Sequence, residues 1–140
     1  MDLESLFSEP QDFRPEPQPT AEEFQRANGE ILHLDLVAAH SLWAHVLWNA
    51  ARSMAKYIDC SLDLRSCNVL EMGAAAALPS IICARKGATV VSSDYPDARL
   101  VDNIQFNAEN NLDIQQLSRF SSIGFCWGQD CKGLLDLVDG

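Results

Sequence analysis

The chain has 140 residues and a mass of 15.5 kDa, the size of one ordinary domain, which excludes a second full domain. It is 47% hydrophobic and 21% charged, close to soluble globular averages, and no apolar run approaches the roughly 20 residues that a membrane helix needs. The net charge of −10 disfavours unaided binding to nucleic acid and favours a basic partner. The chain's start lacks the basic and apolar stretches of a secretory signal.

Residues 1–20 are predicted to form an acidic, proline-rich flexible tail. Four of the six prolines lie within residues 9–20, where they fix φ and remove backbone donors. Thr20 followed by Glu23 matches a capping box, so a short helix is predicted over residues 21–28, ended by Asn28 and Gly29. Residues 21–140 are interpreted as a portion of one domain.

Two further elements precede the central part of the chain. Residues 31–37 alternate, with Leu32, Leu34 and Leu36 on one side, which predicts a half-buried strand. Residues 41–58 change to helical spacing with one apolar stripe, which predicts an amphipathic helix.

Strands and helices then alternate from residue 68 onward. Strands are predicted over residues 68–72, 89–93 and 123–127, with helices beginning near residues 78, 96 and 134. This order is typical of an α/β fold, whose parallel strands are joined by helical crossovers. Ligands of such sheets bind at the carboxyl ends of the strands, so the informative segments are residues 71–77, Asp94 and residues 127–130.

The first strand-to-helix loop consists of small residues, and Asp94 ends the next strand. Small side chains let a ligand lie against the backbone, and a carboxylate can accept two hydrogen bonds from a ribose diol. Together they indicate an adenosine-containing cofactor. Each also has a structural explanation, since the alanines can serve tight packing and Asp94 can form a turn or a helix cap.

The glycine pattern distinguishes between cofactors. The dinucleotide fingerprint requires G-x-G-x-x-G, and here only Gly73 is present. Glu71, Gly73, Ala75 and Ala77 instead match Glu-x-Gly-x-(Gly/Ala)-x-(Gly/Ala). This pattern resembles the first motif of class I S-adenosylmethionine-dependent methyltransferases.

The resemblance then extends over nearly the whole chain. The chain is similar to cytoplasmic protein methyltransferases of the seven-strand class, whose best-known members modify elongation factor 1-alpha at its N-terminus and an adjacent lysine. The matching stretches are Leu6-Phe-Ser-Glu-Pro-Gln-Asp-Phe-Arg-Pro, His40-Ser-Leu-Trp-Ala-His-Val-Leu-Trp-Asn-Ala-Ala-Arg, Val69-Leu-Glu-Met-Gly-Ala-Ala-Ala-Ala-Leu-Pro-Ser, Ser93-Asp-Tyr-Pro-Asp and Trp127-Gly-Gln-Asp. Ala77 stands where relatives usually carry glycine.

The resemblance implies a Rossmann-like, doubly wound, mostly parallel sheet, of which this chain holds only the N-terminal portion. It implies S-adenosyl-L-methionine as the cofactor. The cofactor-binding residues it implies are Trp48, Gly73, Ala74, Ala75, Asp94 and Trp127. Trp48 and Trp127 have a structural alternative as buried packing residues, and no catalytic residue and no metal site can be named.

The functions that the sequence leaves open belong to different classes. The first is an N-methyltransferase acting on a protein amine, inactive as the 140-residue chain. Some relatives are labelled nicotinamide N-methyltransferase, which is a competing small-molecule substrate. A nucleotide-binding oxidoreductase and a non-catalytic remnant acting only as a binding module are the others. A cytoplasmic location is expected, because five cysteines without a CxxC pair favour a reducing compartment.

Overall fold

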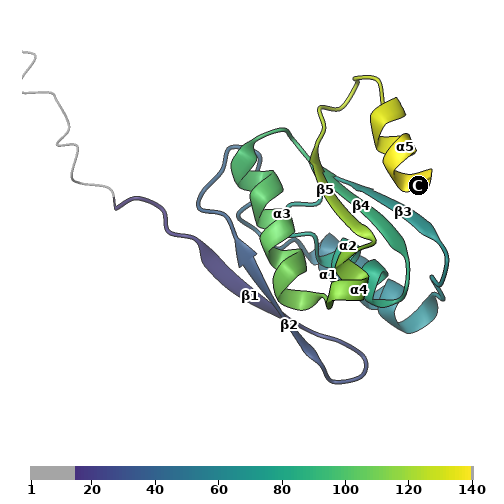
Figure 1. Ribbon diagram of the computed structural model, residues 1–140. Coiled ribbons are helices and arrows are strands. Elements are labelled where there is room, and N and C mark those ends of the chain that lie inside the picture. The colour runs from purple at the N-terminus through teal and green to yellow at the C-terminus, as the bar shows by residue number, and fades with distance from the viewer. Residues whose placement is uncertain (1–14, 140) are drawn as a thin grey trace, which may run out of the picture.

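The computed structural model describes residues 15–139. Within this range the chain forms a two-stranded and a three-stranded sheet with five helices around them (Figure 1). The strands are β1 (Thr20–Gln25), β2 (Ile31–Leu36), β3 (Asn68–Met72), β4 (Thr89–Asp94) and β5 (Phe120–Gly124). The helices are α1 (Asn49–Ser61), α2 (Leu78–Arg85), α3 (Ala98–Asn111), α4 (Ile114–Leu117) and α5 (Lys132–Asp139).

The three-stranded sheet is parallel throughout, in the order β3-β4-β5. Val90 and Val91 of the central strand point to opposite faces, as strand geometry requires. Val90 belongs to the main core with residues of α2 and α3, whereas Val91 packs with Leu134 and Val138 of α5. Helices therefore cover both faces of this sheet, which confirms the predicted mixed α/β architecture with parallel strands (Figure 1).

The predicted helix over residues 21–28 is wrong. Residues 20–25 form β1, which pairs antiparallel with β2 and places Phe24 opposite Leu32. Asn28 and Gly29 form the connecting turn, in which Gly29 has a φ of +87°. Asn-Gly is the strongest short-range signal for a hairpin, and strand pairing outweighs the capping-box pattern.

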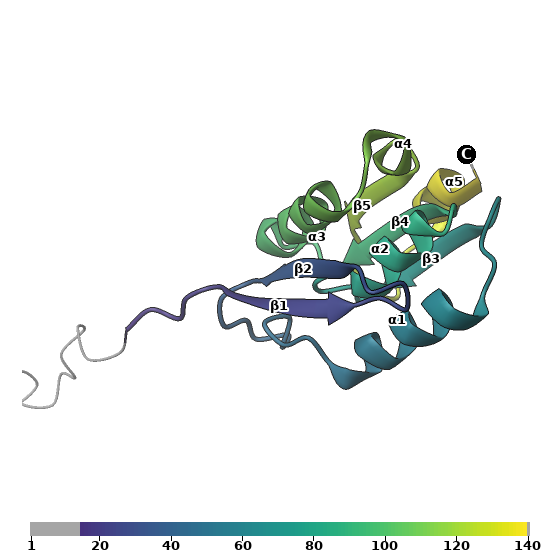
Figure 2. The ribbon, with the colours of Figure 1, turned by 90° about the horizontal axis from the view of Figure 1, so that it is seen from below.

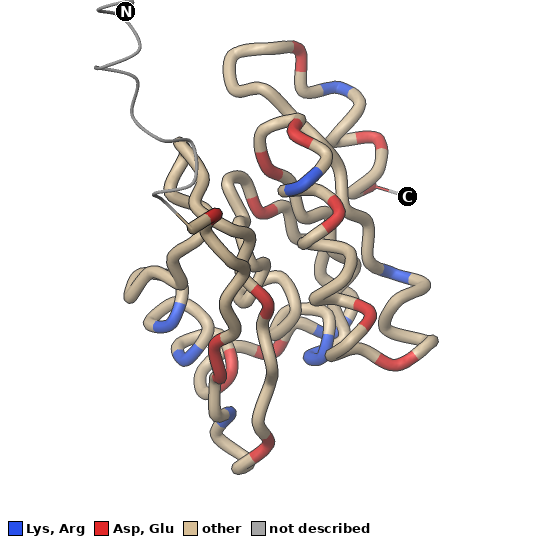
Figure 3. The backbone as a smooth tube through the Cα atoms, turned by 90° about the vertical axis from the view of Figure 1, so that its left-hand side faces the viewer, with Lys and Arg blue, Asp and Glu red and all other residues tan. Residues whose placement is uncertain are grey.

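The hairpin lies against α3 (Figure 2). Leu32, Leu34 and Leu36 are buried, as the alternating pattern predicts, and belong to the main core. Asn107 and Asn111 of α3 accept hydrogen bonds from backbone N–H groups of β2, at 2.8 and 3.1 Å. Acidic residues are spread along the hairpin and α3 with basic residues between them (Figure 3).

Three other boundaries differ from the sequence prediction. The helix predicted over residues 41–58 begins at Asn49, since Trp43 has a φ of +61°, which no right-handed helix accommodates. The third parallel strand covers residues 120–124 rather than 123–127. Helix α4 was not predicted, although Asp113 and Gln116 form a capping box at its start.

Most of the predicted tail cannot be compared with the structure. Residues 1–14 lie outside the described residues, and residues 15–19 are exposed and without regular structure. The tail and the single domain portion over residues 21–140 stay predictions.

Candidate functional site

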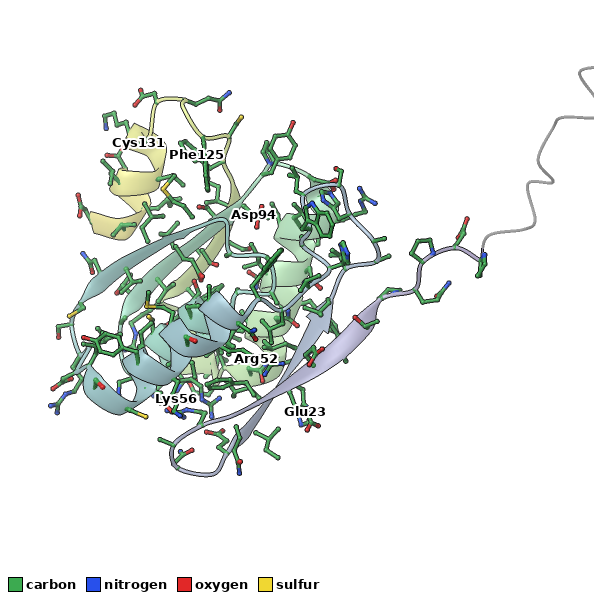
Figure 4. The ribbon with its side chains drawn as sticks, turned by 180° about the vertical axis from the view of Figure 1, so that it is seen from behind. Glu23, Arg52, Lys56, Asp94, Phe125 and Cys131 are labelled. Carbon is green, nitrogen blue, oxygen red and sulfur yellow. The ribbon has the colours of Figure 1, made fainter. Side chains whose placement is uncertain are left out.

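The carboxyl ends of β3, β4 and β5 meet beside a cavity of about 400 Å³. Three loops that follow these strands form one side, and the segment that precedes α1 forms the other. Figure 4 shows Asp94 and Phe125 at this same end of the sheet. The lining residues are Leu42, Trp43, Ala44, Trp48, Gly73, Ala75, Asp94, Tyr95, Phe125, Cys126 and Trp127. The volume is within the range of small-ligand sites.

Asp94 ends the central strand, and its carboxylate is held by backbone donors. The N–H of Ala75 donates to Oδ2 and the N–H of Tyr95 donates to Oδ1, each at 2.7 Å. Only 9% of Asp94 is exposed. Because a carboxylate oxygen accepts more than one hydrogen bond, both oxygens can accept further bonds from a ligand. Asp94 is also the one charged residue among those lining the cavity.

The loop after β3 has an unusual backbone. Gly73, Ala75 and Ala77 have φ angles of +76°, +48° and +61°, the left-handed region that glycine adopts without strain. These are the three positions that the methyltransferase motif reserves for glycine or alanine. The motif therefore reflects a backbone requirement of this loop.

Most N–H groups of this loop already have acceptors within the protein. Gly73 and Ala74 both donate to the carbonyl oxygen of Ser93, at 2.9 and 3.0 Å. Ala75 donates to Asp94, and Ala77 donates to the carbonyl oxygen of Ala74 at 2.7 Å. A pyrophosphate-binding loop needs free N–H groups that point at the ligand. Four of the five N–H groups of residues 73–77 are occupied, so this loop is poorly suited to a pyrophosphate.

Aromatic side chains stand around the cavity. Trp48 is 51% exposed and Trp127 is 69% exposed, so neither is a buried packing residue. A Cβ atom on Gly73 would lie 3.3 Å from Cζ2 of Trp127, which places this ring close to the loop. Trp43 and Tyr95 are also largely exposed. Such rigid aromatic faces can stack on a purine or contact a cation.

A second cavity of about 340 Å³ adjoins the first, since both are lined by Trp48, Gly73 and Ala75. It lies between α1 and the loop after β3, and Glu71 is its only charged lining residue. Burial raises the pKa of Glu71 to about 7; hydrogen bonds from Ser80 oppose the rise, and the Asp94 carboxylate adds to it. The Ser80 N–H donates to Oε2 of Glu71 at 3.0 Å.

The structure brings the six candidate cofactor residues together. Five of them line the first cavity, and Ala74 lines the second. Sequence reasoning missed other lining residues, of which Tyr95 and Trp43 are the largest. Tyr95 directly follows Asp94, and Trp43 belongs to the same tryptophan-rich stretch as Trp48, so both signals were available in the sequence.

The described part of the chain holds neither a candidate metal-binding group nor a candidate membrane-spanning helix. Within residues 15–139, no group of three or more His, Cys, Asp or Glu residues is placed to hold a metal ion. No helix in that range is long and apolar enough to cross a membrane.

Comparison with known proteins finds similar protein methyltransferases. No family model matches the chain. It is 44% identical over 137 residues to a protein N-terminal and lysine N-methyltransferase of Schizosaccharomyces pombe, covering 93% of this chain and 53% of the relative. Proteins with the same description from Debaryomyces hansenii and Candida glabrata are 44% and 39% identical, over 94% and 99% of this chain and 54% and 59% of their own lengths. Over the part that it spans, the chain is similar to these protein methyltransferases.

The kinship with protein methyltransferases expected from the sequence is confirmed by these relatives. The chain spans about half the length of the curated relatives it matches. The cavity at the strand ends contains two residues of the methyltransferase motif, Gly73 and Ala75, together with Asp94 at the end of β4.

Proposed function

We propose that the protein is an S-adenosylmethionine-dependent N-methyltransferase acting on a protein amine, and that its cofactor binds in the cavity at the ends of β3, β4 and β5. The observation that carries this proposal is the chemistry of the lining. The walls are aromatic and apolar, the one charged lining residue is Asp94, and no Lys or Arg lines the cavity. This composition suits a nucleoside that carries a cationic sulfonium.

The residues present fit that cofactor. Asp94 would accept hydrogen bonds from the ribose hydroxyls, using the acceptor capacity that its two backbone bonds leave. Trp127 and Trp48 would contact the rings and the apolar parts. Gly73, Ala74 and Ala75 would lie under the methionine part, between the two adjoining cavities. When bound, the cofactor supplies an activated methyl group.

A dinucleotide cofactor fits less well. Its pyrophosphate carries negative charge, and neither a basic side chain in the cavity lining nor a set of free N–H groups in the loop after β3 would offset that charge. This favours the methyltransferase over the oxidoreductase alternative.

We further propose that the parallel sheet is part of a Rossmann-like, doubly wound sheet. Within residues 15–139, β3 pairs only with β4, so its other edge is available to a further strand. An unpaired strand edge is a liability that proteins normally cover. The unpaired edge supports the expectation from the family that more strands complete the sheet.

The acceptor amine must reach the site in its neutral form, because its lone pair forms the new bond to carbon. An N-terminal amine, with a pKa near 8, is partly neutral at pH 7, whereas a lysine, near 10.4, must lose its proton on binding. The chain's part in this reaction is to align the two reactants and exclude water with its aromatic walls. We name no catalytic base.

We propose elongation factor 1-alpha as the protein acceptor and the cytoplasm as the location, on the strength of the family resemblance. The acidic character of the chain, with a net charge of −10, would attract a basic segment of that substrate.

Transfer of a deuterated methyl group tests the proposal. Because the 140-residue chain alone is expected to be inactive, the test uses the protein with its sheet completed by the further strands. This protein, its Asp94→Asn variant and an Asp102→Asn control on the exposed face of α3 are incubated with labelled cofactor and elongation factor 1-alpha. Mass spectrometry is expected to find label on the N-terminal amine or a lysine with the unaltered protein and the control, and little with Asp94→Asn. Label on nicotinamide instead would support the small-molecule alternative. No label on any acceptor would support the remnant alternative.

A further inference from the structure

The segment of residues 38–48 supplies four of the residues that line the first cavity, yet it has no regular secondary structure. Turns within the segment define its path. The backbone N–H of Trp43 donates to the carbonyl oxygen of His40 at 3.0 Å, and the N–H of Leu42 donates to Nδ1 of His40 at 3.1 Å. His40 itself donates from its backbone N–H to Nδ1 of His45 at 3.2 Å. His40 is thus the centre of this segment's hydrogen bonding.

One side-chain hydrogen bond joins this segment to a part of the chain that is distant in sequence. Nε2 of His40 lies 3.1 Å from Oδ2 of Asp97, which is 57 residues away in sequence. Apart from the bond that continues into α1, no other hydrogen bond within residues 15–139 joins residues 38–48 to another part of the chain. The imidazole is buried, with 6% of its side chain exposed.

The partner carboxylate is firmly placed. Oδ1 of Asp97 accepts a hydrogen bond from the backbone N–H of Arg99 at 2.9 Å and so caps α3. The backbone N–H of Asp97 donates to the carbonyl oxygen of Tyr95 at 2.7 Å. Hydrogen bonds from Arg99 and His40 hold the pKa of Asp97 well below its usual value, so it is an ionised acceptor at neutral pH. Because Leu42 N–H donates to Nδ1, a neutral His40 carries its proton on Nε2 and donates to Asp97.

Loss of the hydrogen bond between His40 and Asp97 is expected to let residues 38–48 move. Trp43 has a φ of +61°, a strained backbone conformation for an aromatic residue that persists only where surrounding contacts impose it. Trp43 and Trp48 are both largely exposed, whereas Ala44 is buried and Leu47 packs against the main core, so the two indole rings are the loosely packed part of this segment.

We propose that His40 is a positioning residue, and that its hydrogen bond to Asp97 sets the wall formed by residues 42–48 against the wall formed by Asp94 and Tyr95. The pair acts on the shape of the cavity and does not touch the ligand. The expected effect on cofactor affinity rests on the function proposed above, whereas the effect on the segment's order does not.

Two substitutions of His40 separate its two ring nitrogens. His40→Gln places an amide donor where Nε2 lies and keeps the bond to Asp97. His40→Asn places an acceptor where Nδ1 lies and keeps the bond from Leu42, but does not reach Asp97. A bond to a charged partner is worth about 1.5–3 kcal/mol, so His40→Asn is expected to weaken S-adenosylhomocysteine binding about tenfold or more. His40→Gln should bind within about twofold of the unaltered protein.

Hydrogen exchange of the ligand-free protein gives an independent reading. We expect the backbone amides of residues 40–48 to exchange at least about fivefold faster in His40→Asn than in His40→Gln, because only His40→Asn loses the hydrogen bond to Asp97. Asp113→Ala, which removes the cap of α4 far from the cavity, serves as the control and should change neither exchange of residues 40–48 nor affinity.

Several results would overturn the proposal. Equal exchange in His40→Asn and His40→Gln would show that the pair does not hold the segment. Faster exchange in His40→Asn with unchanged affinity for S-adenosylhomocysteine would show that the His40–Asp97 pair does not shape the site. If the unaltered protein does not bind S-adenosylhomocysteine, the proposed function fails, and hydrogen exchange alone then decides whether the pair orders the segment.

Discussion

The side-chain amide of Asn107 donates a hydrogen bond of 3.1 Å to the carbonyl oxygen of Ala76. The same side chain bonds both backbone groups of Asp35 in β2, accepting at 2.8 Å and donating at 2.9 Å. Asn107 is fully buried and bonds three backbone groups, of which the carbonyl oxygen of Ala76 is itself buried. One residue of α3 thus joins the hairpin to the loop after β3.

Replacing Asn107 by alanine is therefore expected to destabilise the protein by about 2 kcal/mol, because the Asp35 N–H and the buried Ala76 carbonyl oxygen lose their side-chain partner. The Asp35 carbonyl oxygen keeps the hydrogen bond that Asn103 donates at 3.0 Å. Urea unfolding followed by circular dichroism measures this. Asn110→Ala, on the exposed side of the same helix, is the control and should change stability by less than about 0.5 kcal/mol. Equal stabilities of the two variants would contradict the role given to Asn107.

Substitution by glycine is expected to have different effects on stability at two neighbouring positions of the loop after β3. Ala75 has a φ of +48°, so Ala75→Gly relieves about 1–2 kcal/mol of backbone strain and offsets the added flexibility of the unfolded chain. Ala74 lacks a positive φ and is buried, so Ala74→Gly only adds flexibility and loses a methyl group. We expect Ala75→Gly to be more stable than Ala74→Gly by about 1–2 kcal/mol in thermal unfolding. The reverse order would show that the loop is not strained at Ala75.

The end of β5 fits closely against the turn that follows β4. A Cβ atom on Gly124 would lie 2.8 Å from Cα of Pro96. Gly124→Ala is expected to destabilise the protein by about 1–3 kcal/mol, because backbone would have to shift. Gly133 of α5 has no atoms near its added Cβ, so Gly133→Ala should stabilise by about 0.5–1 kcal/mol. Comparable destabilisation by both changes in a urea titration would refute the packing explanation.

Glu71 predicts a particular dependence of stability on pH. Its pKa is about 7 in the folded protein against 4.5 for an ordinary glutamate, so the folded state binds more protons between these values. Its stabilising contribution is complete below pH 4.5 and is lost as pH rises through 7. Glu71→Gln should flatten this decline, which is on the order of 3 kcal/mol. Urea midpoints at several pH values test this, with Glu109→Gln as the exposed control; an unchanged slope for Glu71→Gln would count against it.

The parts of the fold that were predicted correctly are those with strong local patterns. The alternation at Leu32, Leu34 and Leu36 and the apolar stripe of α3 follow from which side of each element is buried. The helix predicted in place of β1 failed because its capping-box residues are exposed and strand pairing with β2 supplies the structure. Such pairing is non-local, and a local pattern does not contain it.

In the candidate site, too, the residues predicted correctly belong to local sequence patterns, and the rest depend on non-local contacts. Gly73 and Ala75 were predicted from the methyltransferase motif, which reflects the backbone of the loop after β3, and Asp94 was predicted from its place at the end of a strand. The segment before α1 was predicted to be helical because its apolar residues have helical spacing. Residues of this segment instead line two cavities. Their position depends on contacts across the fold, namely the bond of His40 to Asp97 and the packing of Leu47 against the main core, which a local pattern does not contain.

Calorimetric titration of the protein with S-adenosylhomocysteine and, separately, with NAD tests most directly whether the cavity is a methyl-donor site. We expect S-adenosylhomocysteine to bind, Asp94→Asn to weaken that binding at least about tenfold, Asp102→Asn to leave it unchanged, and NAD to give no heat of binding. Binding of NAD without S-adenosylhomocysteine, or equal affinities for Asp94→Asn and Asp102→Asn, would contradict the assignment of the site.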